Sequence, residues 1–219
     1  MLLNDVLRDQ IQARLAAFGV HRLPVDSHRA AAVALVLIEE GTGAMVNGVP
    51  SPPDWSTSAA LLVTRRAQAM SNHSGQWALP GGRIDPGETA IAAALRETHE
   101  EVGLELGTAD VLGTLDDYVT RSGFMITPVI VWGGRAQQLR PAPQEVASVH
   151  RIPLAEFMRP DAPLLDPSED AGRQILRLPV GDNWIAAPTA AMVYQFVEVC
   201  IRGLGTRVAH YDQPVFARR

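Results

Sequence analysis

The stretch from Gly81 to Leu104, GGRIDPGETAIAAALRETHEEVGL, restricts the fold of this chain more than any other segment. It predicts a helix over residues 88–102, because apolar residues recur there at helical spacing. An irregular, glycine-rich loop over residues 73–85 precedes it. One stripe of the helix, at about 100° per residue, is apolar apart from a threonine. The stripe consists of Ile91, Leu95, Thr98 and Val102.

The opposite side of the predicted helix carries three carboxylates, Glu97, Glu100 and Glu101. Like charges three and four residues apart destabilise a helix, and Arg96 offers local relief to Glu100. A divalent cation would relieve more of the repulsion, since carboxylate oxygens are the ligands that magnesium prefers. The Gly82 carbonyl would add a further ligand, because glycine permits a close backbone approach. The alternative interpretation is a solvated acidic face beside an ordinary turn.

The rest of the chain predicts strands between flanking helices. Apolar helical spacing marks the two ends of the chain, and Pro188 suits the first turn of the closing helix. Mixed strands with helices before, between and after them favour an α/β sandwich. The expected helices cover residues 2–18, 154–158 and 189–201. The expected strands cover residues 30–38, 59–64, 111–119, 125–132 and 146–152, a hairpin pairs 174–178 with 183–185, and a long loop covers 40–58.

Composition limits the class of protein. A length of 219 residues favours one compact domain over residues 29–219, with an N-terminal helix and connector over 1–28 packed on its core. A formal net charge of −5 argues against nucleic acid as a partner, because that binding needs clustered lysine and arginine. Cys200 is the single cysteine, which excludes an intrachain disulfide. No signal peptide or membrane span is recognisable, so we expect a cytoplasmic protein without a membrane partner.

A family resemblance follows from the spacing of the acidic segment. Gly82, five residues, Glu88, seven residues and then RETHEEVGL (96–104) resemble the Nudix box. The resemblance implies a Nudix-type α/β/α sandwich with a mixed β-sheet. It also implies hydrolysis of the diphosphate bond of a nucleoside-diphosphate derivative with Mg²⁺ or Mn²⁺. Thr98 departs from the aliphatic residue usual in the family, and we expect its methyl to pack while its hydroxyl bonds back to the helix.

The resemblance also assigns roles within the box. Arg96 would orient a glutamate, and one of Glu100 or Glu101 would also activate the attacking water, with the choice between them left open. The metal ligands that the resemblance implies are Gly82, Glu97, Glu100 and Glu101.

A further acid outside the box is expected as a ligand or a base. Glu145 is the first candidate, because it begins a predicted strand after a polar connector; an ordinary strand-edge glutamate is the equal alternative. Asp116 and Asp117 are weaker candidates.

The segment before the box, LLVTRRAQAMSNHSGQWALPGG (61–82), resembles the corresponding segment of the coenzyme A diphosphatases of this superfamily. Ser71 and Leu79 depart from the arginine and phenylalanine expected in that group. Arg65 and Arg66 would clamp phosphates. Neighbours on a strand point to opposite faces, so one of these two arginines is expected to reach the substrate. The other proposed substrate-binding residues are His73, Gly81 and Arg121, and the aromatic candidates for stacking on adenine are Trp77, Tyr118 and Phe124.

Several substrates and one non-enzymatic role fit these residues. The first is coenzyme A, giving 3′,5′-ADP and phosphopantetheine; the alternatives are ADP-ribose, a dinucleotide or a (d)NTP. A Nudix domain that only binds a nucleotide and acts as a regulator is the alternative of another class. The full set of box carboxylates favours the enzyme. The loop over residues 40–58 and the terminal helices leave a homodimer open.

Overall fold

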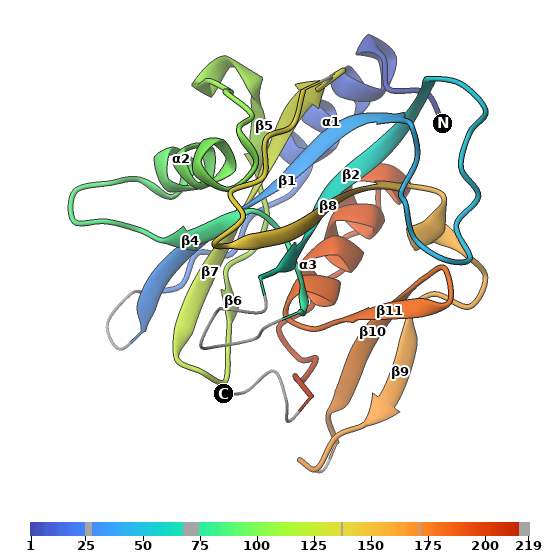
Figure 1. Cartoon of the computed structure of the whole chain (residues 1–219). Coiled ribbons are helices and arrows are strands. Elements are labelled where there is room, and N and C mark those ends of the chain that lie inside the picture. Colours follow the sequence, from blue (N-terminus) through green and yellow to red (C-terminus); the bar gives the residue numbers. More distant parts are fainter. Residues whose placement is uncertain (25–27, 68–74, 137, 171, 215–219) are drawn as a thin grey trace.

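The computed structural model describes residues 1–24, 28–67, 75–136, 138–170 and 172–214 (Figure 1). Its helices are α1 (Asp5–Ala17), α2 (Ala90–Val102) and α3 (Thr189–Phe196), with short 3-10 helices η1 (Thr108–Asp110) and η2 (Glu156–Met158) and a π-helix η3 (Val197–Arg202). Its strands are β1 (Arg29–Gly41), β2 (Ser56–Arg66), β3 (Trp77–Ala78), β4 (Gly81–Arg83), β5 (Val111–Thr114), β6 (Tyr118–Val119), β7 (Phe124–Gly134), β8 (Val146–Pro153), β9 (Leu164–Pro167), β10 (Gln174–Val180) and β11 (Asn183–Ala186).

A mixed sheet forms the centre of the molecule. Its main path runs β3-β2-β1-β7-β5, and β4, β6 and β8 pair with β1, β7 and β2. β1 runs parallel to β7 and antiparallel to β2, which confirms the mixed sheet. A small antiparallel sheet, β11-β10-β9, lies beside it.

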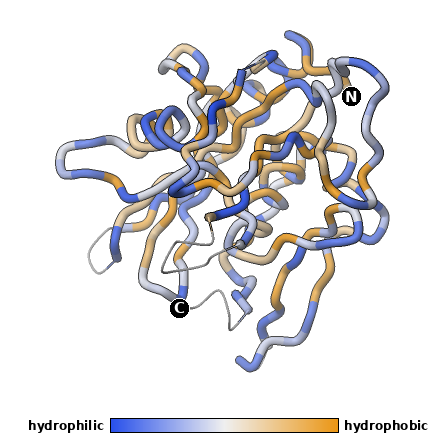
Figure 2. Tube along the Cα trace, viewed as in Figure 1, coloured by the Kyte–Doolittle hydropathy of each residue, from blue (hydrophilic) through white to orange (hydrophobic). Residues whose placement is uncertain are grey.

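Side chains alternate along β1, so this strand presents apolar side chains on both faces of the central sheet. Helices cover both of these faces. Ala32, Ala34 and Val36 pack into one hydrophobic cluster with α2. Leu35 and Leu37 belong to a second cluster, which contains the buried residues of α1 and α3. Figure 1 shows α2 and α3 on either side of the sheet, and Figure 2 shows hydrophobic stretches converging at its centre. The expected α/β/α sandwich is therefore confirmed.

Helix α2 is delimited by its own sequence. The Thr89 side chain accepts a hydrogen bond from the Ala92 backbone N–H, and Gly103 ends the helix with φ of 68°. Thr98 is buried and its hydroxyl donates to the Ala94 carbonyl at 2.7 Å, as expected from its place on the apolar stripe. The helix buries Ala93 and Ala94 completely, whereas Ile91 and Leu95 are half-buried. This close packing brings the acidic side of α2 towards the sheet.

Several elements of the structure differ from the expected ones. The strand over 111–119 is split into β5 and β6, because the carboxylates of Asp116 and Asp117 accept backbone N–H groups of the connector at His21 and Leu23. The loop over 73–85 contains the short strands β3 and β4, and β9 has no counterpart in the prediction. The closing helix continues as the π-helix η3, whose Cys200 and Ile201 carbonyls accept hydrogen bonds from Arg14.

Helix α1 belongs to the same hydrophobic cluster as the sheet. Its buried residues Leu7, Ile11 and Leu15 lie in the cluster that also contains α3. The division of the chain at residue 28 stays a prediction. Within the described ranges, no helix combines the length and the hydropathy needed to cross a bilayer.

Candidate metal centre

Three carboxylates meet beside the central sheet. Glu97 and Glu101 lie one turn apart on α2, and Glu145 precedes β8. One oxygen from each lies within 4.8 Å of the other two. The Ala67 backbone N–H donates to the Glu145 carbonyl at 2.8 Å, which fixes this glutamate beside β2. Elements that are distant in the sequence therefore build the cluster together.

The glycine bend of β4 passes directly under the acids. Gly82 pairs with Ala32 of β1, and a Cβ at position 82 would collide with the Glu97 carboxylate. A Cβ at Gly81 would lie 2.7 Å from the Val33 Cα. The Gly81 backbone N–H donates to the Glu101 carboxylate. Neither position has room for a larger side chain, so both require glycine. The bend therefore fixes the carboxylates of Glu97 and Glu101.

Bringing these acids together in a partly buried site costs electrostatic free energy. Burial raises the pKa of Glu101 to about 8, and the charges of Glu97 and Glu145 act in the same direction. Arg66 and the Gly81 N–H oppose that shift. Burial also raises the pKa of Glu97, against the hydrogen bond from Arg96. A bound cation would remove this cost, because it compensates several negative charges at once.

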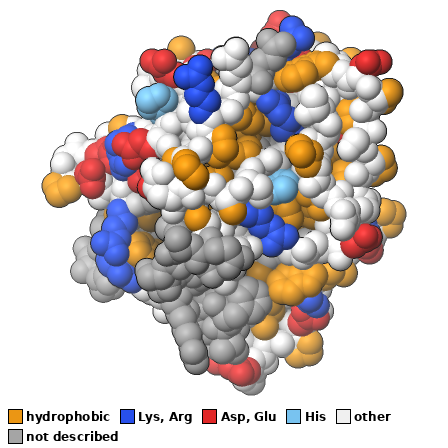
Figure 3. Space-filling model, viewed as in Figure 1, with side chains coloured by type: hydrophobic (Ala, Val, Ile, Leu, Met, Phe, Trp, Pro, Cys, Tyr) orange, Lys and Arg blue, Asp and Glu red, His pale blue; other side chains and the backbone are white. Residues whose placement is uncertain are grey.

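Arg96 connects the acids of the box. Its guanidinium lies 3.0 Å from Glu88, 2.9 Å from Glu97 and 3.0 Å from Glu100, and it donates to the Arg83 carbonyl. The hydrogen bond to Glu88 contributes most to raising the pKa of Arg96, and the same contact lowers the pKa of Glu88. Figure 3 shows the acidic and basic side chains interleaved at the left of the view, where Figure 1 places α2. Arg96 is thus placed to orient Glu97.

The structure groups the acids differently from the sequence pattern. Glu145 joins Glu97 and Glu101, whereas Glu100 lies outside that group, with a side chain that is 55% exposed and paired with Arg96. Helical periodicity puts Glu100 and Glu101 on one broad side, but only burial separates the acid that faces the sheet from the acid that faces solvent. The sequence named Glu145 as a candidate ligand or base from its place at a strand start, and the structure brings it beside Glu97 and Glu101.

The two adjacent arginines of β2 point to opposite faces. Arg66 faces the acids, since its charge lowers the pKa of Glu101, and its Nε is buried without a hydrogen-bond partner among the described residues. Arg65 lines a pocket on the other face. Arg121, which we expected to reach the substrate, is paired with Asp170 and with Asp212 at 3.0 Å, so its guanidinium is already neutralised. His73, like Ser71, lies outside the described residues.

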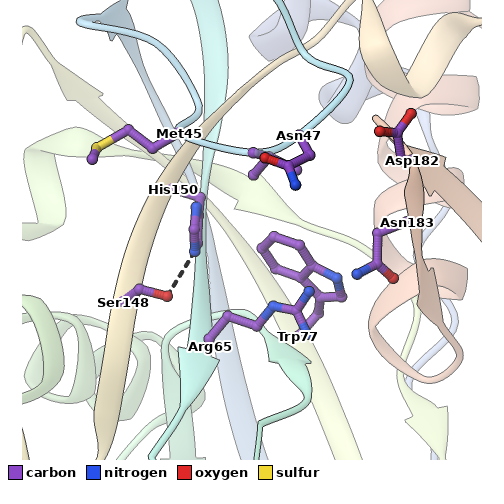
Figure 4. Close-up of a pocket in the computed structure, with 9 residues that line it drawn as sticks. Met45, Asn47, Arg65, Trp77, Ser148, His150, Asp182 and Asn183 are labelled. Atoms are coloured by element: carbon purple, nitrogen blue, oxygen red, sulfur yellow. Dashed lines mark hydrogen bonds between the residues drawn. The ribbon is translucent and has the colours of Figure 1, made fainter.

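The pocket beside Arg65 has a volume of about 410 Å³ (Figure 4). Its wall comes from β2, β3, β8, the loop after β1 and the turn between β10 and β11. Of the aromatic candidates, Trp77 lines this pocket, and Tyr118 is buried with its hydroxyl donating to the Tyr211 carbonyl. Phe124 lies under Arg29, whose guanidinium carbon is 4.0 Å from the ring centre. The lining residues are Met45, Val46, Asn47, Arg65, Trp77, Ser148, His150, Asp182 and Asn183.

A mixed sheet between helices, with the half-buried Glu97 and the buried Glu101 of one helix gathered over a glycine bend, defines a class of α/β proteins suited to holding a hard cation. The model of the NUDIX domain matches residues 28–177, which is more than half of the chain. The chain therefore belongs to the Nudix family.

Relatives in this family are similar over part of their length. The chain is 40% identical over 100 residues to the protein of Enterobacter sp. (strain 638) named "Uncharacterized Nudix hydrolase NudL", covering 45% of this chain and 52% of that protein. The NudL of Escherichia coli (strain SMS-3-5 / SECEC) is 34% identical over 133 residues, covering 60% and 61%. The chain thus spans about half to three-fifths of the length of these relatives. A solved Nudix hydrolase from M. smegmatis, RenU, is similar with a TM-score of 0.47 and 21% identity, covering 82% of this chain and 89% of that one.

Proposed function

We propose that this chain hydrolyses the diphosphate bond of a nucleoside-diphosphate derivative with the help of Mg²⁺ or Mn²⁺. The observation that carries the proposal is the convergence of Glu97, Glu101 and Glu145 within 4.8 Å beside a glycine bend. Membership of the Nudix family supports it, since the chain keeps every carboxylate of the box.

The residues present fit a hard divalent cation. Glu97, Glu101 and Glu145 offer carboxylate oxygens, which Mg²⁺ and Mn²⁺ prefer. The Gly82 backbone approaches the Glu97 carboxylate closely, which supports its carbonyl as a further proposed ligand. Burial raises the pKa values of Glu97 and Glu101, and a cation beside these acids would oppose that shift. A bound cation supplies charge neutralisation on the diphosphate and activation of water.

The protein groups divide the remaining work. Arg66 orients the diphosphate, because its side chain faces the acids and guanidinium matches phosphate oxygens. Arg96 positions Glu97 and Glu100. The proton of the attacking water passes to a carboxylate of the cluster or to Glu100 at its rim. Water adds to one phosphorus, the bridging P–O bond breaks, and each product leaves with one phosphate.

Coenzyme A is the substrate that we propose first. The likeness of residues 61–82 to the coenzyme A diphosphatases supports this choice. The products would be 3′,5′-ADP and phosphopantetheine. ADP-ribose, diadenosine polyphosphates and dNTPs complete the panel, because their diphosphates present the same chemistry to the cluster.

The test incubates the purified chain with this panel in Mg²⁺ and in Mn²⁺ and identifies products by mass spectrometry. Glu101→Gln and Glu145→Gln are expected to lower kcat/KM by about two orders of magnitude or more, typical of losing a metal ligand or a base. Glu100→Gln tests whether Glu100, at the rim of the cluster, is the base that accepts the proton of the attacking water. Glu105→Gln is the matched control, since this exposed acid follows α2 outside the cluster. No product from any substrate with either cation would contradict the proposed function.

A further inference from the structure

The pocket beside Arg65 lies across the sheet from the acid cluster. Arg65 pairs in register with Trp77 of β3 and Ser148 of β8, so these three residues surround one point near the end of β2. Arg66, the next residue, faces the acids on the opposite side. A volume of about 410 Å³ is within the range of small-molecule sites.

Arg65 brings a positive charge into this pocket. Its guanidinium carbon lies 3.8 Å from the centre of the Trp77 ring, and one of its N–H groups donates to the Gly75 carbonyl at 2.8 Å. Among the described residues, no carboxylate is within ion-pair distance of Arg65. Burial lowers the pKa of Arg65, so the charge is partly desolvated without a compensating anion. Asp182 stands at the far end of the pocket (Figure 4), over Gly48.

Trp77 adds an unsatisfied donor to the same wall. The indole is 8% exposed, and its Nε1 is buried without a hydrogen-bond partner in the described part of the chain. Buried N–H groups are normally paired, so such a donor calls for an acceptor that the described residues do not supply. An oxygen that is shared between Arg65 and Trp77 would satisfy both groups.

The histidine of the wall, His150, is neutral. The Nδ1 of His150 lies 2.8 Å from the Ala44 carbonyl, which can only accept, so Nδ1 carries the hydrogen. The Nε2 then accepts from the Ser148 hydroxyl at 2.7 Å (Figure 4). Burial lowers the pKa of His150, and the charge of Arg65 contributes to the shift. The Ser148–His150 pair therefore satisfies itself and leaves Arg65 as the cation of the pocket.

We propose that this pocket is a second anion site, which binds a phosphate-type group through the Arg65 guanidinium and the Trp77 Nε1–H. Asn47 and Asn183 offer amides to the rest of the bound molecule. The anion is either a further phosphate on the substrate, remote from the diphosphate, or a free phosphate ion. The catalytic part of the test rests on the proposed function, whereas the binding part does not.

The binding experiment uses the full chain without metal. Isothermal titration compares 3′,5′-ADP with 5′-AMP, which lacks one phosphate, and inorganic phosphate is titrated separately. The wild type is expected to bind 3′,5′-ADP about tenfold more tightly than 5′-AMP, as for one charged hydrogen-bonded contact. Arg65→Gln should reduce this preference to less than about twofold, and Trp77→Phe should weaken it while the ring is kept.

Arg135→Gln is the matched control, because Arg135 also stacks on a tryptophan, 5.1 Å from the Trp55 ring, and does not line the pocket. The control should keep the preference for 3′,5′-ADP. Unchanged far-ultraviolet circular dichroism and thermal midpoint would establish that each variant is folded.

The kinetic experiment separates the two sources of the anion. Coenzyme A and 3′-dephospho-coenzyme A differ by one phosphate. If the wild type has a higher kcat/KM for coenzyme A and Arg65→Gln abolishes this preference, the site binds a phosphate of the substrate. Equal turnover of the pair, with rates that respond to inorganic phosphate in the wild type and not in Arg65→Gln, assigns it to a free anion. If Arg65→Gln binds 3′,5′-ADP and phosphate as tightly as the wild type does, the inference is overturned, even if hydrolysis proceeds. Arg65-dependent binding without any hydrolysis would overturn the proposed function alone.

Discussion

Glu101 carries the main electrostatic conflict of the molecule. It is 6% exposed, stands beside two other acids and receives the Gly81 N–H as a local donor. The spacing of the box identified Glu101 as a candidate metal ligand or base, and it identified Glu100 for the same roles. Periodicity gives the angular position of a side chain on a helix, but not the depth at which the helix lies on the sheet. That depth follows from Ala93 and Ala94, which are fully buried, and it separates the two acids.

Glu101→Gln should stabilise the metal-free protein in alkaline solution. The folded pKa of about 8 lies above the ordinary value of 4.5, so between these pH values the native state binds more protons than the unfolded state. Stability is therefore lost as the pH rises through this window, and the penalty is complete above pH 8. The variant lacks that penalty, and its Tm at pH 8.5 should exceed that of the wild type by at least about 2–4 °C.

Near pH 4 the two proteins should differ little, because Glu101 is then protonated in both states. Added Mg²⁺ should raise the Tm of the wild type at pH 8.5 and leave that of the variant nearly unchanged. Differential scanning calorimetry at both pH values provides the measurement. A variant that is less stable than the wild type at pH 8.5 would show that Glu101 is not under strain.

Gly82→Ala should damage the cluster without unfolding the chain. The added Cβ would collide with the Glu97 carboxylate, which must then leave its place beside Glu101 and Glu145. Mg²⁺ affinity measured by calorimetric titration should fall by about tenfold or more. Gly19→Ala is the control, since a Cβ at that exposed position meets nothing within 4 Å. Equal Mg²⁺ affinity in the two variants would mean that the bend does not support the site.

Among the elements, strand β2 links the two sites. The sequence predicted that Arg65 and Arg66 would be separated by strand alternation, and the structure places them on opposite faces. It gave no sign that the face of Arg65 would be a pocket, because the wall is completed by Trp77, His150 and Asn183 from distant elements. Contacts of this kind depend on the pairing of β2 with β3 and β8, which local patterns do not specify.

The π-helical conformation of η3 could not be predicted from the local sequence either. Its sequence continues the apolar pattern of α3, but Arg14 of α1 donates to the Cys200 and Ile201 carbonyls, at 2.8 Å and 2.5 Å. A partner outside the helix therefore satisfies carbonyl groups at its end. We interpret this contact as the connection between the first and last helices.

Arg14→Met should weaken that connection and leave the acids intact. Two partly buried carbonyls lose a charged donor, and the thermal midpoint should fall by about 2–6 °C, as for a loss of about 1–2 kcal/mol in a chain of this size. Mg²⁺ affinity should be unchanged, because the contact lies on the other face of the sheet. Gln12→Met, at an exposed position of the same helix, serves as the control for the new side chain. Equal midpoints for the two variants would contradict the connection.

On the scale of the whole molecule, the central sheet separates two sets of polar groups. One face carries the carboxylates of α2 with Glu145, and the other carries the pocket of Arg65. The sandwich and the acidic helix α2 followed from sequence spacing, whereas the small sheet of β9, β10 and β11 was predicted only as a hairpin. Its turn, at Asp182 and Asn183, completes the pocket.

The N-terminal segment provides the last test, since the sequence treated residues 1–28 as an addition to the domain. In the structure, Leu7, Ile11 and Leu15 are almost fully buried in the cluster that holds α3, and a Cβ at Gly113 would lie 3.1 Å from Leu15. Burying such side chains contributes about 1.5–3 kcal/mol each. Their sum approaches the 5–15 kcal/mol that stabilises a typical protein.

A chain that starts at residue 20 should therefore lose most of its cooperative unfolding transition in urea, followed by tryptophan fluorescence. A triple Leu7→Ala, Ile11→Ala, Leu15→Ala variant of the full chain should behave in the same way, because it removes the packing and keeps the helix length. The exposed substitution Val6→Ala is the control, since this side chain is 74% exposed. A shortened chain that unfolds cooperatively at the wild-type urea midpoint would show that residues 1–19 are an appendage and that the core is complete without them.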